Sequence, residues 1–85
     1  MYYLYILQNE SNKKFYIGQT NNLQDRIKRH NEGRSMYTKG KGCWQLYYFE
    51  EFKDRTEATR REIDIKKKKS RIYIENLAKI KHFEG

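Results

Sequence analysis

Two runs of aromatic and β-branched residues open the chain, and a short polar segment separates them. Residues 1–8 and 14–20 are rich in the residue types that favour β-strands. Residues 9–12, Asn-Glu-Ser-Asn, form a cluster typical of a turn. We therefore predict an antiparallel hairpin. If the four polar residues form its loop, Tyr5 lies opposite Tyr16, and the two phenols stand side by side on one sheet face.

Capping residues predict where helices begin. Asn22 is a favourable N-cap for a first helix that ends before Gly33, a residue suited to a left-handed stop. Asp54 is the corresponding N-cap of a second helix. Residues 72–80 carry apolar side chains at helical spacing and predict a third helix.

A third strand is predicted over residues 44–52, where Trp44, Leu46, Tyr48 and Phe52 follow a period of two and are expected to share one face of the sheet. The element order is then β-β-α-β-α-α. This order is typical of the α+β class, with a small, mostly antiparallel three-stranded sheet flanked by helices. We expect the helices to cover one face of the sheet. With 85 residues, the chain is expected to form a single domain over residues 1–85.

The charge balance indicates a polyanionic partner. Lys and Arg number 19 against 11 Asp and Glu, a formal net charge of +8. No segment approaches the roughly 18 apolar residues of a membrane-spanning helix, and the N-terminus lacks the pattern of a secretory signal. We expect a cytoplasmic location and no membrane partner. Cys43 is the only cysteine, which excludes an internal disulfide and a zinc cluster built on cysteines.

One carboxylate is placed against the pattern of the second helix. Ala58 and Ile65 define an inward-facing stripe, and Glu62 lies within it. An ionised carboxylate there is costly unless it meets a cation. Lys66, four residues further on, is one candidate, because side chains at this spacing are neighbours on a helix.

Five landmarks then appear in a recognisable order and spacing. They are Tyr3-Leu4-Tyr5, Tyr16-Ile17-Gly18, Arg26, His30 and Ala58-Thr59-Arg60-Arg61-Glu62. In this ordered set the chain resembles the GIY-YIG nuclease family from residue 2 to about residue 69. The resemblance implies a metal-dependent endonuclease that hydrolyses DNA phosphodiester bonds, structure-selective in repair or recombination.

The resemblance also implies roles for the candidate catalytic residues. Glu62 would bind one divalent metal ion, Mg²⁺ or Mn²⁺, which are hard cations suited to a carboxylate. Arg26 would hold the phosphate through its guanidinium fork. Tyr16, with Tyr5 beside it, would position or deprotonate the attacking water. His30 is the alternative general base, because its ordinary pKa lies near neutrality.

Further residues are expected to contact DNA. Gly18 lacks a Cβ and allows a close approach to its strand, a loop supplies basic groups and a ring for stacking, and the second helix ends in lysines. The predicted nucleic-acid-binding residues are Gly18, Arg34, Tyr37, Lys39, Lys41, Lys66 and Lys67.

The chain departs from larger family members in two respects. The first motif lacks its Gly-Ile pair, and we expect no separate DNA-binding domain, so the resemblance leaves room for a protein partner or a dimer. No small-molecule cofactor is expected. Two other functions are compatible with the charge: a non-catalytic nucleic-acid-binding module on the same scaffold, and an interaction protein that uses only the basic surface around Lys66–Lys69.

Overall fold

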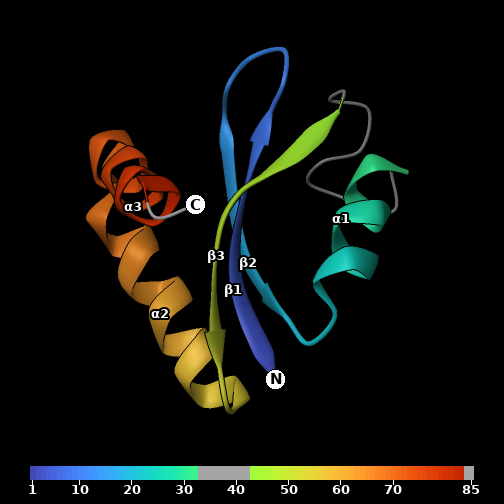
Figure 1. Cartoon of the computed structure of the whole chain (residues 1–85), viewed down its shortest axis with the longest axis vertical. Coiled ribbons are helices and arrows are strands. Elements are labelled where there is room, and N and C mark those ends of the chain that lie inside the picture. The colour runs from blue at the N-terminus through green and yellow to red at the C-terminus, as the bar shows by residue number, and fades with distance from the viewer. Residues whose placement is uncertain (33–42, 84–85) are drawn as a thin grey trace.

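The computed structural model describes residues 1–32 and 43–83, with side chains described as far as Lys79. It contains three strands and three helices in the predicted order (Figure 1). The elements are β1 (Tyr2–Asn9), β2 (Phe15–Thr20), α1 (Leu23–Asn31), β3 (Trp44–Phe52), α2 (Arg55–Lys68) and α3 (Arg71–Phe83). The predicted α+β class is confirmed.

The sheet is antiparallel with the strand order β2-β1-β3, so β1 lies in the centre. Helix α1 lies on one face, while α2 and α3 lie on the other (Figure 1). The expectation that helices cover only one face was therefore wrong. The four residues from Leu4 to Leu7 are all fully buried, and a continuous apolar run of this kind is typical of a strand covered on both faces.

The hairpin register differs from the predicted one by two residues. Tyr5 pairs with Gly18, and Tyr16 pairs with Leu7. The turn is longer than four residues because the Asn9 side chain holds it by two hydrogen bonds. The side-chain oxygen accepts from the backbone N–H groups of the second and third residues after Asn9, at 2.8 and 3.1 Å. A shift by an even number leaves every side chain on its own face. Tyr5 and Tyr16 are thus diagonal neighbours on one face rather than a direct pair.

The alternation of β3 changes faces at a bulge. The pairing with β1 shifts between Ile6 and Leu7, which leaves Tyr47 as an extra residue in β3. Trp44 consequently packs on the α1 side of the sheet and Tyr48 on the α2 side. The prediction that these two side chains share a face was wrong, because strict period two holds only in a strand without a bulge.

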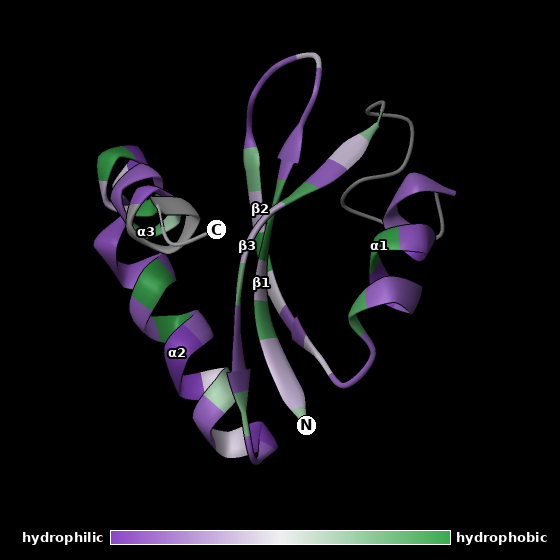
Figure 2. Cartoon of the chain, in the orientation of Figure 1, coloured by the Kyte–Doolittle hydropathy of each residue, from purple (hydrophilic) through white to green (hydrophobic). Residues whose placement is uncertain are grey.

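The buried apolar side chains form one cluster on each side of the sheet. Hydrophobic residues alternate with hydrophilic ones along α1 and α2 (Figure 2). The buried residues of the α2–α3 cluster are Leu4, Ile6, Tyr48, Ile65 and Ile74. Those of the α1 cluster are Tyr5, Leu7 and Trp44, with Tyr16, Leu23, Ile27 and Phe49 packed against them. Among the described residues, no helix is long and apolar enough to cross a membrane.

Both predicted helix starts are confirmed by their hydrogen bonds. The Asn22 side chain accepts from the backbone N–H of Asp25 at 3.1 Å, and the Asp54 side chain accepts from that of Glu57 at 2.9 Å. Each bond satisfies a donor that the first turn of a helix otherwise leaves unpaired. The predicted stop at Gly33 lies outside the described residues.

Candidate active site

A buried tyrosine and a buried histidine form the centre of the site on the α1 side of the sheet. Tyr5 on β1 is fully buried and His30 on α1 is 2% exposed. The Tyr5 hydroxyl lies 3.0 Å from His30 Nε2, within hydrogen-bond distance. The two predicted residues, 25 positions apart in sequence, are therefore in direct contact.

Burial favours the neutral form of both groups. Burial raises the pKa of the Tyr5 phenol most, and the Tyr16 phenol raises it further, while the Arg26 guanidinium lowers it. Burial also lowers the pKa of His30, and the Arg26 charge lowers it again. A neutral phenol can donate a hydrogen bond to the unprotonated nitrogen of a neutral imidazole. We therefore interpret the contact as Tyr5 donating to His30.

Tyr16 and Arg26 border this pair at its more accessible side. Tyr16 is half-buried, and its ring centroid lies 4.6 Å from that of His30 and 6.2 Å from that of Tyr5. Arg26 precedes His30 by one helical turn, and its Nε–H is buried without a hydrogen-bond partner among the described residues. An unpaired buried donor costs about 1–3 kcal/mol. A phosphate oxygen is an acceptor that the guanidinium binds well.

Gly18 allows this arrangement because it has no side chain. A Cβ built at Gly18 would lie 2.7 Å from the Tyr5 hydroxyl oxygen and 2.9 Å from Cζ. Both distances are shorter than normal van der Waals contacts. The close approach expected at Gly18 is thus made by the Tyr5 ring.

Glu62 lies on α2, on the side of the sheet opposite to α1 (Figure 1). Its side chain is 20% exposed and pairs with Lys66, with 2.6 Å between Oε2 and Nζ. The ion pair weighed as an alternative from sequence is therefore present. The Glu62 charge also raises the pKa of the Tyr5 phenol, the smallest of the contributions to that shift.

The donor set around Glu62 suits one type of metal site. The described residues contain no group of three or more His, Cys, Asp or Glu side chains that could hold a metal ion. Mg²⁺ is commonly held by one or two carboxylates, together with substrate phosphate oxygens and water. A single carboxylate that shares the ion with a substrate phosphate and water fits that mode. It does not fit a metal site made only of protein ligands.

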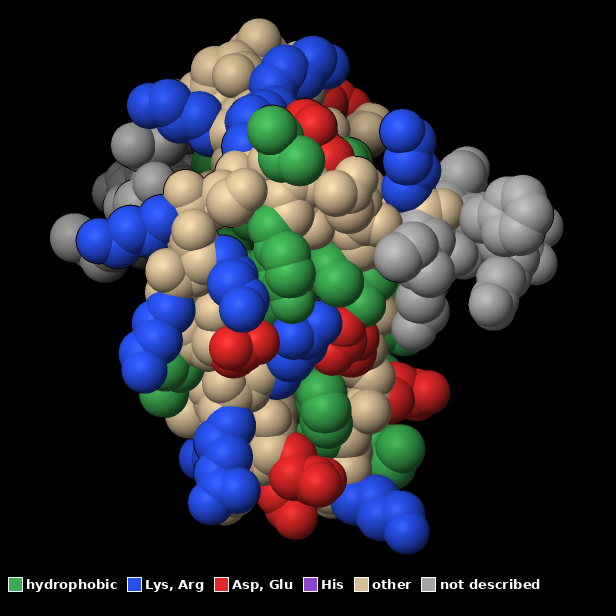
Figure 3. Space-filling view, turned by 90° about the vertical axis from the view of Figure 1, so that its left-hand side faces the viewer, with side chains coloured by type: hydrophobic (Ala, Val, Ile, Leu, Met, Phe, Trp, Pro, Cys, Tyr) green, Lys and Arg blue, Asp and Glu red, His purple; other side chains and the backbone are tan. Residues whose placement is uncertain are grey.

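The predicted DNA-contacting residues are only partly described. Arg34, Tyr37, Lys39 and Lys41 lie outside the described residues. Lys67 is exposed on α2, whereas Lys66 is engaged with Glu62. Lys and Arg side chains are spread over the α2–α3 face with acidic side chains and an apolar stripe between them (Figure 3).

One charged network was missed from sequence. Arg61 on α2 binds both oxygens of Glu50 on β3, at 2.9 and 3.0 Å, and contacts Asp64 at 2.9 Å and the Tyr73 hydroxyl at 3.2 Å. Glu50 also accepts a hydrogen bond from Tyr48. Burial and Glu50 raise the pKa of Tyr48 to about 12. The signal was available, because Glu50 interrupts the apolar pattern of its strand.

The fold and this constellation define a class of protein. Residues 1–76 match the GIY-YIG catalytic domain, and the chain belongs to the GIY-YIG family. Within it, the chain is similar to proteins named UPF0213. It is 48% identical over 68 residues to UPF0213 protein CPE1444 of Clostridium perfringens, covering 79% of this chain and 72% of that protein.

Two further relatives agree with this placement. UPF0213 protein YazA of Bacillus subtilis is 36% identical over 78 residues, which cover 87% of this chain and 78% of YazA. The solution NMR structure of UPF0213 protein BH0048 from Bacillus halodurans is 35% identical with a TM-score of 0.59, and the match covers 95% of this chain and 86% of that one.

Proposed function

We propose that this chain is a divalent-metal-dependent endonuclease that hydrolyses phosphodiester bonds in DNA. Its family is one of nuclease domains. The observation that carries the proposal is the cluster of Tyr5, His30, Tyr16 and Arg26. The Glu62 charge also raises the pKa of the Tyr5 phenol in this cluster. Phosphodiester hydrolysis needs groups of these kinds, namely a phosphate grip, a polar group beside the water and a cation site.

The roles of the residues in the cluster follow from how deeply each side chain is buried. Arg26, with its unpaired Nε–H, holds the phosphate. Tyr16 is half-buried and can touch the attacking water, whereas His30 is 2% exposed and cannot meet bulk solvent. We therefore favour Tyr16 as the group that orients the water. Neutral His30 lies behind the phenols as a proton acceptor.

Glu62 would hold the metal ion. A divalent cation there supplies charge stabilisation to the phosphate oxygens and to the leaving oxygen. Its binding requires Glu62 to exchange or share its present partner, the Lys66 ammonium. This exchange accounts for a carboxylate on the inward side of α2, because the ion pair and the metal site are alternative cations for one charge.

The test compares two Glu→Gln variants on the same helix. Duplex, single-stranded, nicked, flapped and four-way-branched DNA would be incubated with Mg²⁺, with Mn²⁺ and with a chelator. We expect Glu62→Gln to lower cleavage by about a hundredfold or more, with DNA affinity nearly unchanged. The matched control is Glu57→Gln, an exposed position on α2 that should cleave like the parent. The preferred DNA form tests whether the enzyme is structure-selective, as a role in repair or recombination requires.

A non-catalytic nucleic-acid-binding module is the second candidate. It is favoured by the Glu62–Lys66 ion pair, which satisfies the carboxylate without a metal. Binding to DNA with no cleavage of any form, in either metal, would support it. Equal loss of binding and cleavage in a folded Glu62→Gln protein would contradict the role given to Glu62.

A further inference from the structure

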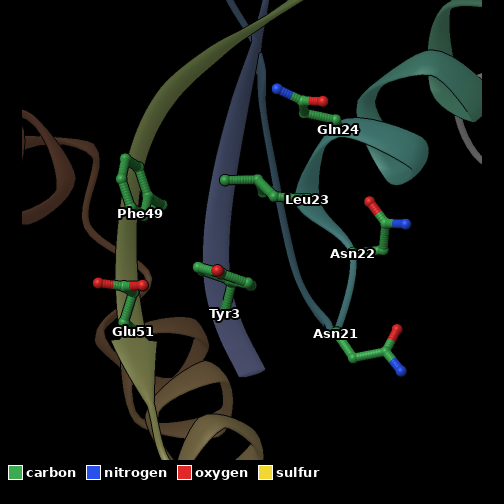
Figure 4. A pocket seen from close by; sticks show the side chains of 7 residues that line it. All are labelled: Tyr3, Asn21, Asn22, Leu23, Gln24, Phe49 and Glu51. Carbon is green, nitrogen blue, oxygen red and sulfur yellow. The ribbon is translucent and has the colours of Figure 1, made fainter. Parts of the chain in front are cut away.

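A hollow of about 460 Å³ lies on the α1 side of the sheet. Tyr3 from β1 and Phe49 and Glu51 from β3 form one wall (Figure 4). Leu23 and Gln24 at the start of α1 form the other wall and point from the helix toward the strands (Figure 4).

The hollow adjoins the proposed active site. Tyr3 precedes Tyr5 by two residues on β1, so both side chains are on the same sheet face. Leu23 packs against the cluster that contains Tyr5. Arg26 follows Leu23 by three residues on α1, which is about one helical turn, or roughly 5 Å along the axis. If Arg26 holds the phosphate of a nucleotide, the base of that nucleotide is therefore within reach of the hollow.

The walls offer an aromatic surface and polar groups together. The Tyr3 and Phe49 rings meet edge to face, with centroids 6.2 Å apart and planes at 61°. Glu51 is exposed, and its carboxylate makes no hydrogen bond or ion pair within the described part of the chain. Gln24 is also exposed, and its amide both donates and accepts. Aromatic faces beside amide and carboxylate groups are the means by which proteins bind unstacked bases.

We propose that this hollow receives one unpaired base of the strand that Arg26 grips, with a preference for guanine. The inference rests on the proposed function and names its substrate class. Guanine presents two adjacent N–H donors on its Watson–Crick edge, which match the two oxygens of the Glu51 carboxylate. That edge is engaged in a duplex, so the base must be single-stranded or turned out of the stack. The enzyme therefore favours DNA that is unpaired beside the cut.

The first test measures binding without metal, so that it does not depend on cleavage. The ¹⁵N-labelled protein would be titrated with dGMP, dTMP and deoxyribose 5-phosphate, and amide shifts followed by NMR. We expect dGMP to shift the amides of Tyr3, Leu23 and Glu51, and the sugar phosphate to shift only those near Arg26. Glu51→Gln should weaken the binding of dGMP at least about fivefold and leave the binding of dTMP unchanged. Glu57→Gln, with the same loss of charge on α2, should change neither.

A pair of variants at Tyr3 tests the stacking surface separately from the carboxylate. Tyr3→Leu removes the stacking surface and should weaken the binding of dGMP and of dTMP alike, by about fivefold or more. Tyr3→Phe keeps the ring and should keep the binding of both. The proposal is overturned if dGMP and the sugar phosphate shift the same amides. It is also overturned if Glu51→Gln and Glu57→Gln behave alike.

Cleavage is then measured separately on a duplex and on the same duplex with one unpaired guanine. Base binding without cleavage of any substrate would retain this inference and overturn the nuclease. Metal-dependent cleavage that ignores the unpaired guanine would retain the nuclease and overturn this inference.

Discussion

At the scale of single residues, the site depends on what is absent at Gly18 as much as on the side chains around it. Tyr5 can occupy the centre of the site only because the residue paired with it on β2 has no Cβ. The Tyr5 ring is fully buried and bonded to His30, so it cannot swing aside as a flexible surface side chain would. The glycine of the second motif is thus explained by packing, with no ligand needed at that position.

Gly18→Ala should reverse the usual sign of a glycine-to-alanine change. Where the backbone and space permit, this change stabilises a protein by about 0.4–1 kcal/mol. Here the new methyl group would lie 2.7 Å from the Tyr5 oxygen. We expect a loss of about 1–3 kcal/mol in the free energy of unfolding, measured by urea denaturation, together with reduced cleavage.

The control for this prediction is a double-mutant cycle with Tyr5→Phe. Removing the hydroxyl relieves the shortest contact but leaves Cζ at 2.9 Å. Gly18→Ala should therefore cost less in the Tyr5→Phe background, though more than nothing. Strictly additive effects would contradict the contact as the cause.

At the scale of elements, the sequence allowed the order and approximate bounds of all six to be predicted, because capping residues and apolar spacing are local signals. The register of the hairpin could not be predicted, since the Asn9 side chain lengthens the turn. Nor could the bulge at Tyr47, which depends on the pairing with β1.

The predicted site shows the same division. Tyr5, Tyr16, Arg26 and His30 could be placed together because a shift of two residues preserves faces. The second helical layer was misplaced although the apolar run from Leu4 to Leu7, which is typical of a strand buried on both faces, can be read from the sequence.

Arg61 fixes the element that carries Glu62. Its fork joins α2 to Glu50 on β3, and its Nη1 joins the Tyr73 hydroxyl on α3. The paired side chains are only 23% and 19% exposed. Arg61→Ala would leave Glu50 half-buried without its cation. We expect a loss of about 2 kcal/mol in the free energy of unfolding, measured by chemical denaturation.

The adjacent arginine provides the matched control. Arg60 is exposed on the same helix, so Arg60→Ala should change stability by no more than about 0.5 kcal/mol. Arg61→Lys should fall between the two, because lysine keeps the charge but not the two-pronged geometry. If Arg60→Ala and Arg61→Ala had equal effects, the network would not be what holds α2.

At the scale of the whole molecule, the sheet separates two surfaces. The α1 side carries the Tyr5 and Tyr16 phenols, the His30 imidazole and the Arg26 guanidinium, while the other side carries α2 and α3 with mixed charges around an apolar stripe (Figure 3). The net charge of +8 is expected to attract polyanions such as DNA. Attraction and chemistry are therefore expected to depend on different residues, and this is what distinguishes a nuclease from a protein that uses only its basic surface.

Salt dependence separates the two contributions. Each phosphate contact to single-stranded DNA changes the slope of log affinity against log salt by about 0.7. If Lys67, exposed on α2, touches a phosphate, Lys67→Ala should reduce the slope by about that amount, while cleavage at saturating DNA stays the same. Arg26→Ala should change cleavage far more than affinity.

Lys14→Ala, at the exposed hairpin turn, is the matched control. A slope that responds to Lys14→Ala and not to Lys67→Ala would place the DNA across the hairpin instead. Cleavage that falls in step with affinity in both lysine variants would mean that attraction and chemistry are not separate.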